Sequence, residues 1–259
     1  MTDRAIETRN LTKRYGDETA VDRLNLAIPE ASVYGFLGPN GAGKTTTMRM
    51  LTTLTTPSDG TGTVAGADIT DRDAVVSNIG YLPEDPPLHG ELTGREQLRY
   101  IAGLRDLPEA DAEDRIDDLL DRFSLSGDAD KRISAYSKGM KQKVGIIQAM
   151  LHDPDVLFLD EPTSGLDPRA ARTVRDTIAS LADGDATVFL STHILPVVDE
   201  LADTIGVLYD GQLVTEGAPD HLKSRAESGD ERTLEDVFLE VTGGIGDNGD
   251  ERPASTEEA

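Results

Sequence analysis

A glycine-rich loop between an apolar segment and a helical one constrains the fold of this chain more than any other feature. Its residues are Gly38, Pro39, Asn40, Gly41, Ala42, Gly43, Lys44 and Thr45. We expect Ser32–Leu37 before the loop to form a buried strand and Thr46–Leu54 after it to form a helix. A loop of this kind presents backbone N–H groups to an anion at a helix N-terminus. The segment therefore predicts a site that wraps the phosphates of a nucleotide.

The last two residues of this loop have separate predicted tasks. Lys44 is expected to reach the β- and γ-phosphates, and the Thr45 hydroxyl to occupy one coordination position of Mg²⁺. The alternative is a flexible glycine turn that binds no ligand. A shuffled chain of this composition would contain about 0.01 matches to the pattern, so we favour the nucleotide site.

Two adjacent carboxylates follow a second apolar segment. Val156–Leu159 has the pattern of a buried strand, and Asp160 and Glu161 come directly after it. In doubly wound sheets, ligands bind at the carboxyl ends of the strands. Asp160 is therefore predicted to meet Mg²⁺, directly or through water, and Glu161 to polarise the attacking water. In so acidic a chain a surface pair of acids is the alternative, which the four preceding apolar residues disfavour.

The remaining apolar patterns indicate an α/β protein with a helical insertion. Short strand-like runs recur early in the chain, helical periodicity then extends from about residue 93 to 152, and apolar strands alternate with helices after that. The expected strands are Val33–Leu37, Gly62–Ala65, Ile79–Leu82, Val156–Leu159, Thr187–Ser191 and Ile205–Tyr209. Alternation of strands and helices is typical of a parallel sheet covered by helices.

Composition narrows the classes of partner and compartment. The 259 residues carry a formal charge of −24, from 49 Asp and Glu against 25 Lys and Arg, which disfavours a nucleic-acid partner. We hypothesise a halophilic source, because molar salt screens such repulsion within about 3 Å. Cysteine is absent, so disulfides and thiolate metal sites are excluded. Without a signal peptide or an apolar run of membrane-spanning length, we expect a soluble, cytoplasmic protein.

Five elements in a fixed order carry a family resemblance. After the phosphate loop come a helical insert, the helix opening Tyr136-Ser137-Lys138-Gly139-Met140, the Leu159-Asp160-Glu161-Pro162 run, the Ser164-Gly165-Leu166-Asp167-Pro168 loop and a strand ending in Ser191-Thr192-His193. Over about residues 11–213 the chain resembles the ATP-binding subunit of an ABC transporter. The resemblance implies a P-loop NTPase core, with a mixed or parallel sheet and an antiparallel β edge, in a domain at residues 1–242. It also implies a helical subdomain at about 86–154. We expect residues 243–259 to be an acidic, disordered tail.

The resemblance also implies residue roles, ATP and Mg²⁺ as cofactors, and a second copy of the chain as partner. The implied positions are the adenine-stacking Tyr15, the phosphate loop from Gly38 to Thr46, the signature residues Ser137 and Gly139, the dimer-contacting Asp167 and the γ-phosphate-sensing His193. In the family, two subunits pair head to tail, so each ATP lies between the phosphate loop of one and the signature helix of the other. Lys44, Glu161 and His193 are then the catalytic set.

Two departures from the family pattern affect these assignments. Tyr136, Lys138 and Met140 replace three of the five usual signature residues, Leu-Ser-Gly-Gly-Gln. Glu84 stands where most of the family has a glutamine that touches Mg²⁺ and the attacking water, and exporter-type subunits often have glutamate there.

A group of cations near the signature is open to two interpretations. Five basic residues without an intervening acid either strengthen attraction to the γ-phosphate or form an ordinary solvated helix face. They are Lys131, Arg132, Lys138, Lys141 and Lys143.

The resemblance favours an ATPase that powers export, of drugs or sodium for example, through a separate transmembrane permease at the cytoplasmic face of the membrane. The apolar stripe from Leu234 to Val241 resembles the C-terminal segment of exporter subunits, although periodicity alone would also fit a core helix. The alternative is a soluble ABC-type ATPase acting as an ATP-gated clamp on ribosomes or DNA. A single nucleotide module, the lack of a coiled-coil insertion and the acidic charge disfavour it. His89, His152 and His221 have no partner at metal-ligand spacing, so we expect surface or loop positions for them.

Overall fold

The computed structural model describes residues 4–182, 184, 186–224 and 233–243. The tail predicted for residues 243–259 lies outside this part except for Gly243, the last residue of the final helix. The strands are β1 (Arg4–Tyr15), β2 (Glu18–Pro29), β3 (Val33–Leu37), β4 (Asp59–Val64), β5 (Ala67–Asp68), β6 (Ile79–Leu82), β7 (Val156–Asp160), β8 (Thr187–Thr192), β9 (Thr204–Tyr209) and β10 (Gln212–Gly217). The helices are α1 (Lys44–Leu51), α2 (Arg72–Val76), α3 (Gly94–Leu104), α4 (Glu109–Arg122), α5 (Lys138–Met150), α6 (Pro168–Ala182), α7 (Leu195–Leu201), α8 (Pro219–Ser224) and α9 (Leu234–Gly243), with short 3-10 turns η1 (Ser126–Asp128) and η2 (Ile133–Ala135).

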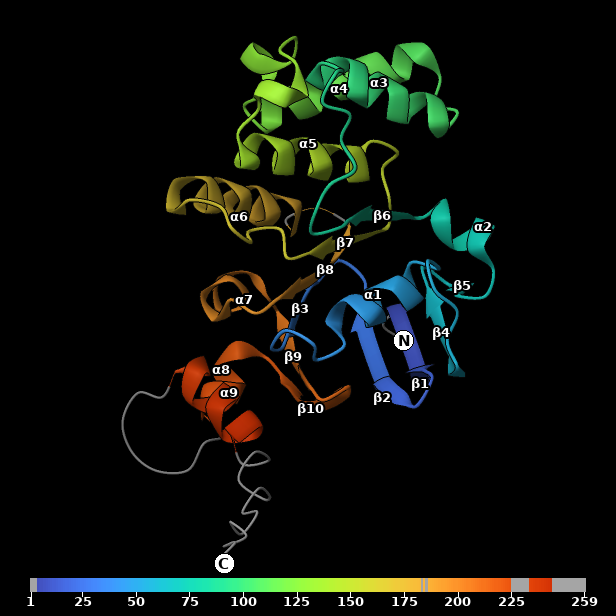
Figure 1. Cartoon of the computed structure of the whole chain (residues 1–259), viewed down its shortest axis with the longest axis vertical. Helices are drawn as coiled ribbons and strands as arrows, with labels where there is room; N and C mark the ends of the chain where they lie inside the picture. Colours follow the sequence, from blue (N-terminus) through green and yellow to red (C-terminus); the bar gives the residue numbers. More distant parts are fainter. Residues whose placement is uncertain (1–3, 183, 185, 225–232, 244–259) are drawn as a thin grey trace, which may run out of the picture.

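A six-stranded sheet forms the centre of the molecule. Its strand order is β10-β9-β3-β8-β7-β6, and β10 alone runs antiparallel to its neighbour. Every residue of β3, β7 and β8 is buried, which explains their continuous apolar runs, since helices cover both faces of a parallel sheet. The predicted α/β core with a mixed, mainly parallel sheet is confirmed. Its order brings the carboxyl ends of β3, β7 and β8 to one edge (Figure 1).

A second, antiparallel sheet has the order β2-β1-β4-β5. Its two long strands, β1 and β2, pair from Arg4↔Pro29 to Tyr15↔Glu18. The amino-acid pattern predicts only short strand-like runs in this region. Several irregularities in register along β1 and β2 break strict alternation, because each bulge shifts the inward-facing positions by one residue.

The helix after the phosphate loop begins earlier and ends earlier than expected. Thr46–Leu54 was predicted, whereas α1 runs from Lys44 to Leu51. Gly43, with φ 103°, takes the left-handed conformation at the helix start. The helix does not continue through Thr53, because its φ of 61° lies in the left-handed region, which is rare for a β-branched residue.

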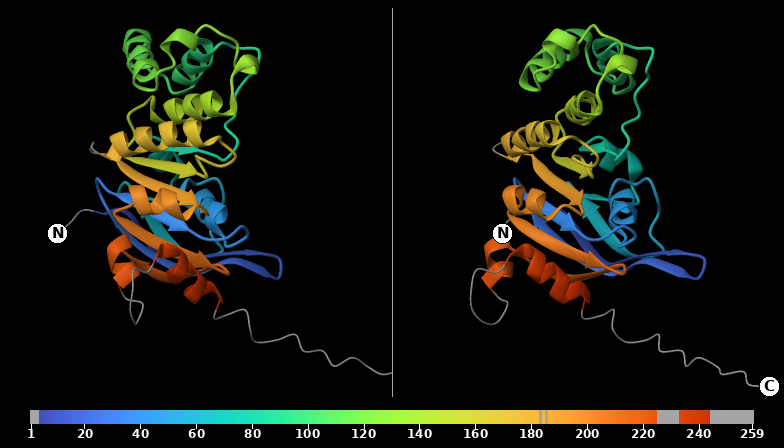
Figure 2. Two further views of the ribbon diagram at one scale, coloured as in Figure 1. Left: turned by 90° about the vertical axis from the view of Figure 1, so that its left-hand side faces the viewer. Right: turned by 60° about the vertical axis from the view of Figure 1, so that its left-hand side comes forward.

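Helices α3, α4 and α5 stack above the sheet in Figure 1, and Figure 2 shows that they form a separate layer. The helical periodicity predicted for about residues 93–152 is confirmed in α4, where Ile116, Leu119 and Leu120 are at most 2% exposed. They pack with Leu98 of α3 and Val144 of α5 in one core cluster. The limits of the subdomain at about 86–154 stay a prediction.

The C-terminal helices pack beneath the sheet. Leu234 and Val237 of α9 join Leu222 of α8 in an apolar cluster with Leu37, the last residue of β3. The predicted apolar stripe of this helix thus supports the strand that leads into the phosphate loop. No helix within the ranges given above is both long and apolar enough to cross a membrane.

Candidate functional site

A cavity of about 470 Å³ opens at the carboxyl edge of the central sheet. It collects residues from the first antiparallel hairpin, the phosphate loop, the segment after β6 and the ends of β7 and β8. The lining residues are Tyr15, Glu18, Ala20, Pro39, Asn40, Gly41, Gly43, Lys44, Thr45, Thr46, Glu84, Glu161, Ser164 and His193. Most of the predicted nucleotide-binding residues therefore share one cavity.

The phosphate loop keeps its shape because two of its glycines have no substitute. Gly43 has φ 103°, and a Cβ there would collide with the carbonyl oxygen of Ala20. A Cβ at Gly38 would collide with the carbonyl oxygen of Leu208. Neighbouring backbone thus approaches the loop closely on two sides, and only residues without a side chain permit that approach.

Lys44 is drawn into the loop. Its side chain is 6% exposed, and its Nζ donates to the carbonyl oxygens of Gly38 at 2.7 Å and Pro39 at 3.2 Å. The same Nζ lies 3.5 Å from Oε1 of Glu161. Two backbone dipoles and one carboxylate therefore compensate the buried ammonium.

Three side chains hold Glu161. Oε2 accepts a hydrogen bond from Thr192 Oγ1 at 3.1 Å, and Oε1 lies 2.9 Å from Nδ1 of His193 as well as close to Lys44. The residue has φ 49°, a left-handed conformation that is uncommon for a side chain of this size. Backbone strain of this kind is found where a side chain must point in one direction, and here it directs the carboxylate into the cavity.

Asp160 fits a magnesium site. It is 2% exposed and accepts one hydrogen bond, from Ser191 Oγ at 2.7 Å. The pKa of Tyr81 is raised to about 12, mainly by burial of the residue and also by the negative charge of the nearby Asp160. A buried carboxylate retains lone pairs beyond a single hydrogen bond, and Mg²⁺ prefers such oxygens.

The protein alone provides few metal ligands. Among the residues that the structure describes, no three His, Asp or Glu side chains gather in a metal-binding group. Mg²⁺ held by Asp160 and the Thr45 hydroxyl would therefore take its other ligands from nucleotide phosphates and water, as is usual for this ion. Glu84, the third predicted metal residue, is exposed and lines the cavity.

Tyr15 lies at the rim of the cavity, where it is 49% exposed. The Nζ of Lys13 lies 5.0 Å from the centroid of its ring and donates to the carbonyl oxygen of Thr56 at 2.7 Å. The ring therefore offers an accessible aromatic surface close to the phosphate loop, as adenine stacking requires.

Ser137, Gly139 and Asp167 do not line this cavity, and each has a local structural role. Ser137 caps α5 by accepting the N–H of Met140 at 3.2 Å. A Cβ at Gly139 would lie 2.9 Å from the Cβ of Ala170 on α6. Asp167 accepts the N–H groups of Arg169 and Ala170, both at 3.0 Å, at the start of α6. Their roles across a dimer interface stay predictions.

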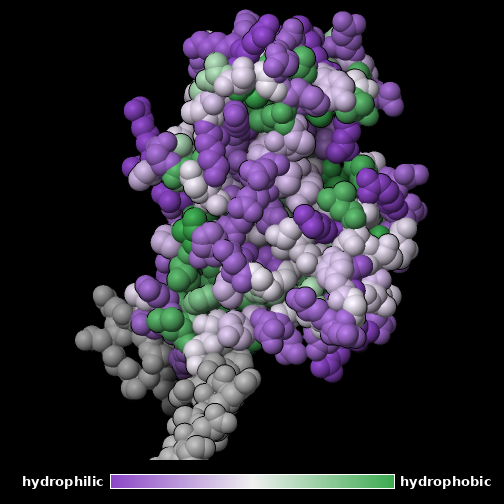
Figure 3. Space-filling model, in the orientation of Figure 1, coloured by the Kyte–Doolittle hydropathy of each residue, from purple (hydrophilic) through white to green (hydrophobic). Residues whose placement is uncertain are grey.

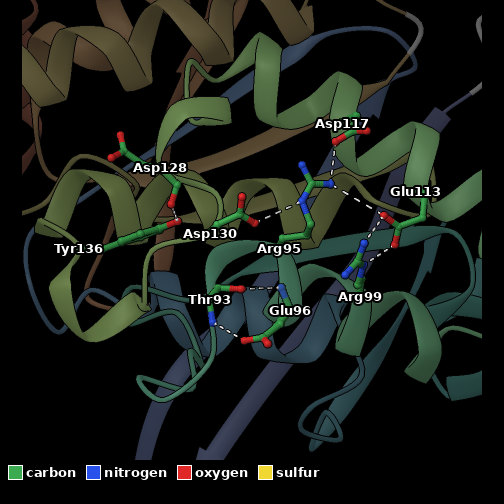
Figure 4. Close-up of polar contacts among 9 residues, drawn as sticks. All are labelled: Thr93, Arg95, Glu96, Arg99, Glu113, Asp117, Asp128, Asp130 and Tyr136. Atoms are coloured by element: carbon green, nitrogen blue, oxygen red, sulfur yellow. Dashed lines mark hydrogen bonds and ion pairs between the residues drawn. The ribbon is translucent and has the colours of Figure 1, made fainter.

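A polar network supports the start of α5 (Figure 4). Tyr136, which replaces the usual leucine, donates its hydroxyl to the carbonyl oxygen of Asp128 at 2.7 Å. Gly94 leaves the space for that hydroxyl, since a Cβ there would collide with it. Nearby, Arg95 of α3 lies 2.6 Å from Asp117 and 3.7 Å from Asp130. The aromatic signature residue thus joins Ser137 to the rest of the helical layer.

Two of the five basic residues of this patch have acidic partners in the structure, and a third is bound to a backbone carbonyl oxygen. Lys131 pairs with Asp128 at 2.5 Å, Arg132 lies 3.3 Å from Glu91, and Lys143 donates to the carbonyl oxygen of Phe123 at 2.8 Å. The acidic partners come from segments distant in sequence or just outside the run. Lys138 and Lys141 line a smaller cavity that also contains Glu84.

The hydroxyls that hold the two acids have no predicted role of their own. Ser191 and Thr192 were noted as part of a motif only, and both are 0% exposed. Ser164, also part of a motif, lines the nucleotide cavity. The available signal was position: polar side chains that end an otherwise apolar parallel strand lie at the ligand-binding edge of the sheet.

Comparisons with known proteins agree with the motifs. The family model described as "ABC transporter" matches residues 21–164. The chain is 42% identical over 247 residues to the daunorubicin resistance ATP-binding protein DrrA3 of Streptomyces coeruleorubidus, covering 95% of this chain and 77% of that relative. It is 40% identical over 222 residues to the bacitracin transport ATP-binding protein BcrA of Bacillus licheniformis, covering 85% and 72%.

A solved structure of the ATP-binding subunit of an ABC transporter is similar to the whole fold. The two superpose with a TM-score of 0.81 at 30% sequence identity, over 92% of this chain and 99% of the other. The similarity therefore extends beyond the short motifs to most of the fold.

Proposed function

Because the chain belongs to the ABC transporter family, we propose that it is the ATP-hydrolysing subunit of an export system and acts through a separate transmembrane permease. The relatives named for daunorubicin resistance and bacitracin transport support export. The observation that carries the proposal is the convergence of Lys44 and Glu161, 3.5 Å apart, in the cavity formed by the phosphate loop and His193.

Nucleotide binding begins with an exchange of partners at Lys44. ATP phosphates replace the carbonyl oxygens and the Glu161 oxygen that now surround Nζ, while loop N–H groups bind the same phosphates. Adenine stacks on Tyr15 at the rim. Release from Lys44 leaves Glu161 free to orient a water molecule toward the γ-phosphate, with His193 on the same side.

Asp160 and Thr45 are the proposed protein ligands of Mg²⁺, with Glu84 near the attacking water. When bound, the ion neutralises charge that develops on the β- and γ-phosphate oxygens. Ser137, Gly139 and Asp167, none of which lines the cavity of its own chain, act in this proposal on the nucleotide of a second copy of the chain. A single protomer therefore hydrolyses ATP slowly until its partner closes the site.

We assign the permease contact to a groove between the central sheet and the helical layer. Its apolar walls include Leu54, 52% exposed, and Leu104, 64% exposed, with Arg72 and Arg105 beside them. Figure 3 shows hydrophobic side chains gathered at the level of α2, one of several hydrophobic groups on this face. An amphipathic segment with an acidic residue fits such a groove. Docking there attaches the chain to the cytoplasmic face of the membrane, with no role for nucleic acid.

The test is purification from the native membrane. We expect a hydrophobic subunit to copurify with the wild-type chain, and Leu104→Asp to abolish copurification while the isolated protein still binds ATP. Retention of the permease by this variant would exclude the groove, and lack of ATP hydrolysis by the wild-type complex would exclude the transport function.

A further inference from the structure

Two adjacent hydroxyl groups at the end of β8 face two adjacent carboxylates at the end of β7. Asp160 lies opposite Ser191 in the parallel pair, and the N–H of Glu161 donates to the carbonyl oxygen of Ser191 at 2.9 Å. Ser191 binds Asp160 and Thr192 binds Glu161. Each acid therefore has a hydroxyl partner of its own, and the register of the sheet keeps the two apart.

The direction of the Thr192 hydroxyl is fixed from both sides. Its Oγ1 accepts the N–H of Ile194 at 3.1 Å, so the single hydroxyl hydrogen is available for Oε2 of Glu161, 3.1 Å away. Thr192 is 0% exposed, and a β-branched side chain has few χ1 rotamers. The hydrogen bond from Thr192 to Glu161 can therefore persist while other side chains in the cavity move.

The other contacts of Glu161 are of a different kind. Lys44 and His193 both lie beside Oε1, and both have a second task at the phosphates in the proposed reaction. When they turn to the nucleotide, Oε1 becomes available for water, and Thr192 still holds Oε2. One oxygen is thus a fixed anchor while the other exchanges partners.

We propose that Thr192 is a positioning residue for hydrolysis, which keeps the Glu161 carboxylate oriented while Lys44 and His193 move to the nucleotide. This inference rests on the proposed function, because Glu161 orients water only in an ATPase. Thr192 itself contacts neither the nucleotide nor water in this scheme, so its effect appears in turnover and not in nucleotide affinity.

The experiment compares Thr192→Val, which keeps the shape and removes the hydroxyl, with Thr192→Ser, which restores it. Loss of a buried hydrogen bond to a charged group is expected to lower kcat about 10- to 100-fold. The KM for ATP and the Kd measured by calorimetry should stay within about twofold. Thr192→Ser should recover kcat to within a few-fold of wild type.

Thr187→Val is the matched control on the same strand. Thr187 is 1% exposed, and its hydroxyl accepts the N–H of Ala31 at 3.0 Å, outside the nucleotide cavity. It should lower the melting temperature in the same way but leave kcat near wild type. If kcat of the Thr192→Val protein stays within twofold of wild type, or falls no more than in the control, the proposal is wrong. Thr192→Ala is the second hydroxyl-free variant if the valine does not fold.

A double variant separates action through Glu161 from a general structural effect. In a Glu161→Gln background, single-turnover hydrolysis should change little when Thr192→Val is added, because the group that it positions is gone. Multiplicative losses would contradict the inference and leave the ATPase assignment intact. If wild-type protein binds ATP but never hydrolyses it, the proposed function fails, and the role of Thr192 fails with it.

Discussion

Glu161→Gln should separate the two tasks of this carboxylate, the pairing with Lys44 and the orientation of water. The side chains of both residues are less than a tenth exposed, and the nitrogen-to-oxygen distance is 3.5 Å. At an effective dielectric constant of about 20, two unit charges at this distance attract each other by about 5 kcal/mol. The cost of desolvating the two charges offsets most of this attraction, so we expect the pair to contribute about 1 to 2 kcal/mol to the free energy of unfolding of the protein without nucleotide.

The substitution should destabilise the protein without nucleotide, whereas it should have little effect on the stability of the ATP-bound protein. Without nucleotide, the substitution leaves Lys44 with only the carbonyl oxygens of Gly38 and Pro39, so unfolding should become easier. With ATP, the phosphates compensate the ammonium in both proteins. The variant should therefore bind ATP about 5- to 30-fold more tightly, because about 1.4 kcal/mol corresponds to a factor of ten.

Although the variant should bind ATP more tightly, its turnover should be slower. Losing the group that orients and polarises water is expected to lower kcat about 10²- to 10⁴-fold. Calorimetry with MgATP, thermal unfolding with and without nucleotide, and steady-state hydrolysis together measure the three effects. Near-normal hydrolysis would refute the role of Glu161 in catalysis, whereas weaker ATP binding would refute its pairing with Lys44 in the resting state.

Further predictions concern the phosphate loop, salt and pH. Lys44→Ala should weaken ATP binding about 10- to 100-fold by calorimetry, whereas Lys223→Ala, which removes a cation paired with Asp199, should leave it unchanged. If the charge of −24 reflects a halophilic source, the melting temperature should rise by several degrees between 0.1 and 2 M KCl, and an unchanged value would contradict that hypothesis. The pKa of His152 is lowered mainly by burial and also by the positive charge of the nearby Arg105. As the pH falls, the unfolded chain is therefore protonated at this residue before the folded protein is. His152 should then cost stability as the pH falls through about 6.5, the unfolded value. His152→Gln should remove this loss in denaturant titrations at pH 7 and 5, and an identical acid dependence in both proteins would exclude it.

The sequence predicted those elements in which local pattern and global fold agree. Val33–Leu37 and Val156–Asp160 are wholly buried strands, so their composition alone was informative. The start of α1 at Lys44 was missed because the left-handed conformation of Gly43, and not helix propensity, determines where the helix begins. The long β1–β2 hairpin was missed because register shifts break its alternation.

The site was predictable where one short segment carries the chemistry and less so where distant segments meet. The loop from Gly38 to Thr45 could be recognised from its own residues. The partners of Lys131 and Arg132 could not, since Glu91 is brought to Arg132 only by the folding of the helical layer. The same reason hid Thr192, whose role depends on the pairing of β7 with β8 and not on any local motif.

Ser137, Gly139 and Asp167 are held rigidly by their own chain although they do not line its nucleotide cavity. Ser137 closes the first turn of α5, Gly139 packs against α6, and Asp167 fixes the start of α6. Residues with such local roles have little freedom to adjust to a nucleotide, so in the proposed dimer a partner's ATP would reach them through movement of whole subunits. We therefore expect closure of the proposed dimer around ATP to be an all-or-none step. In the proposed dimer, that rigidity would explain why binding needs one chain and hydrolysis needs two.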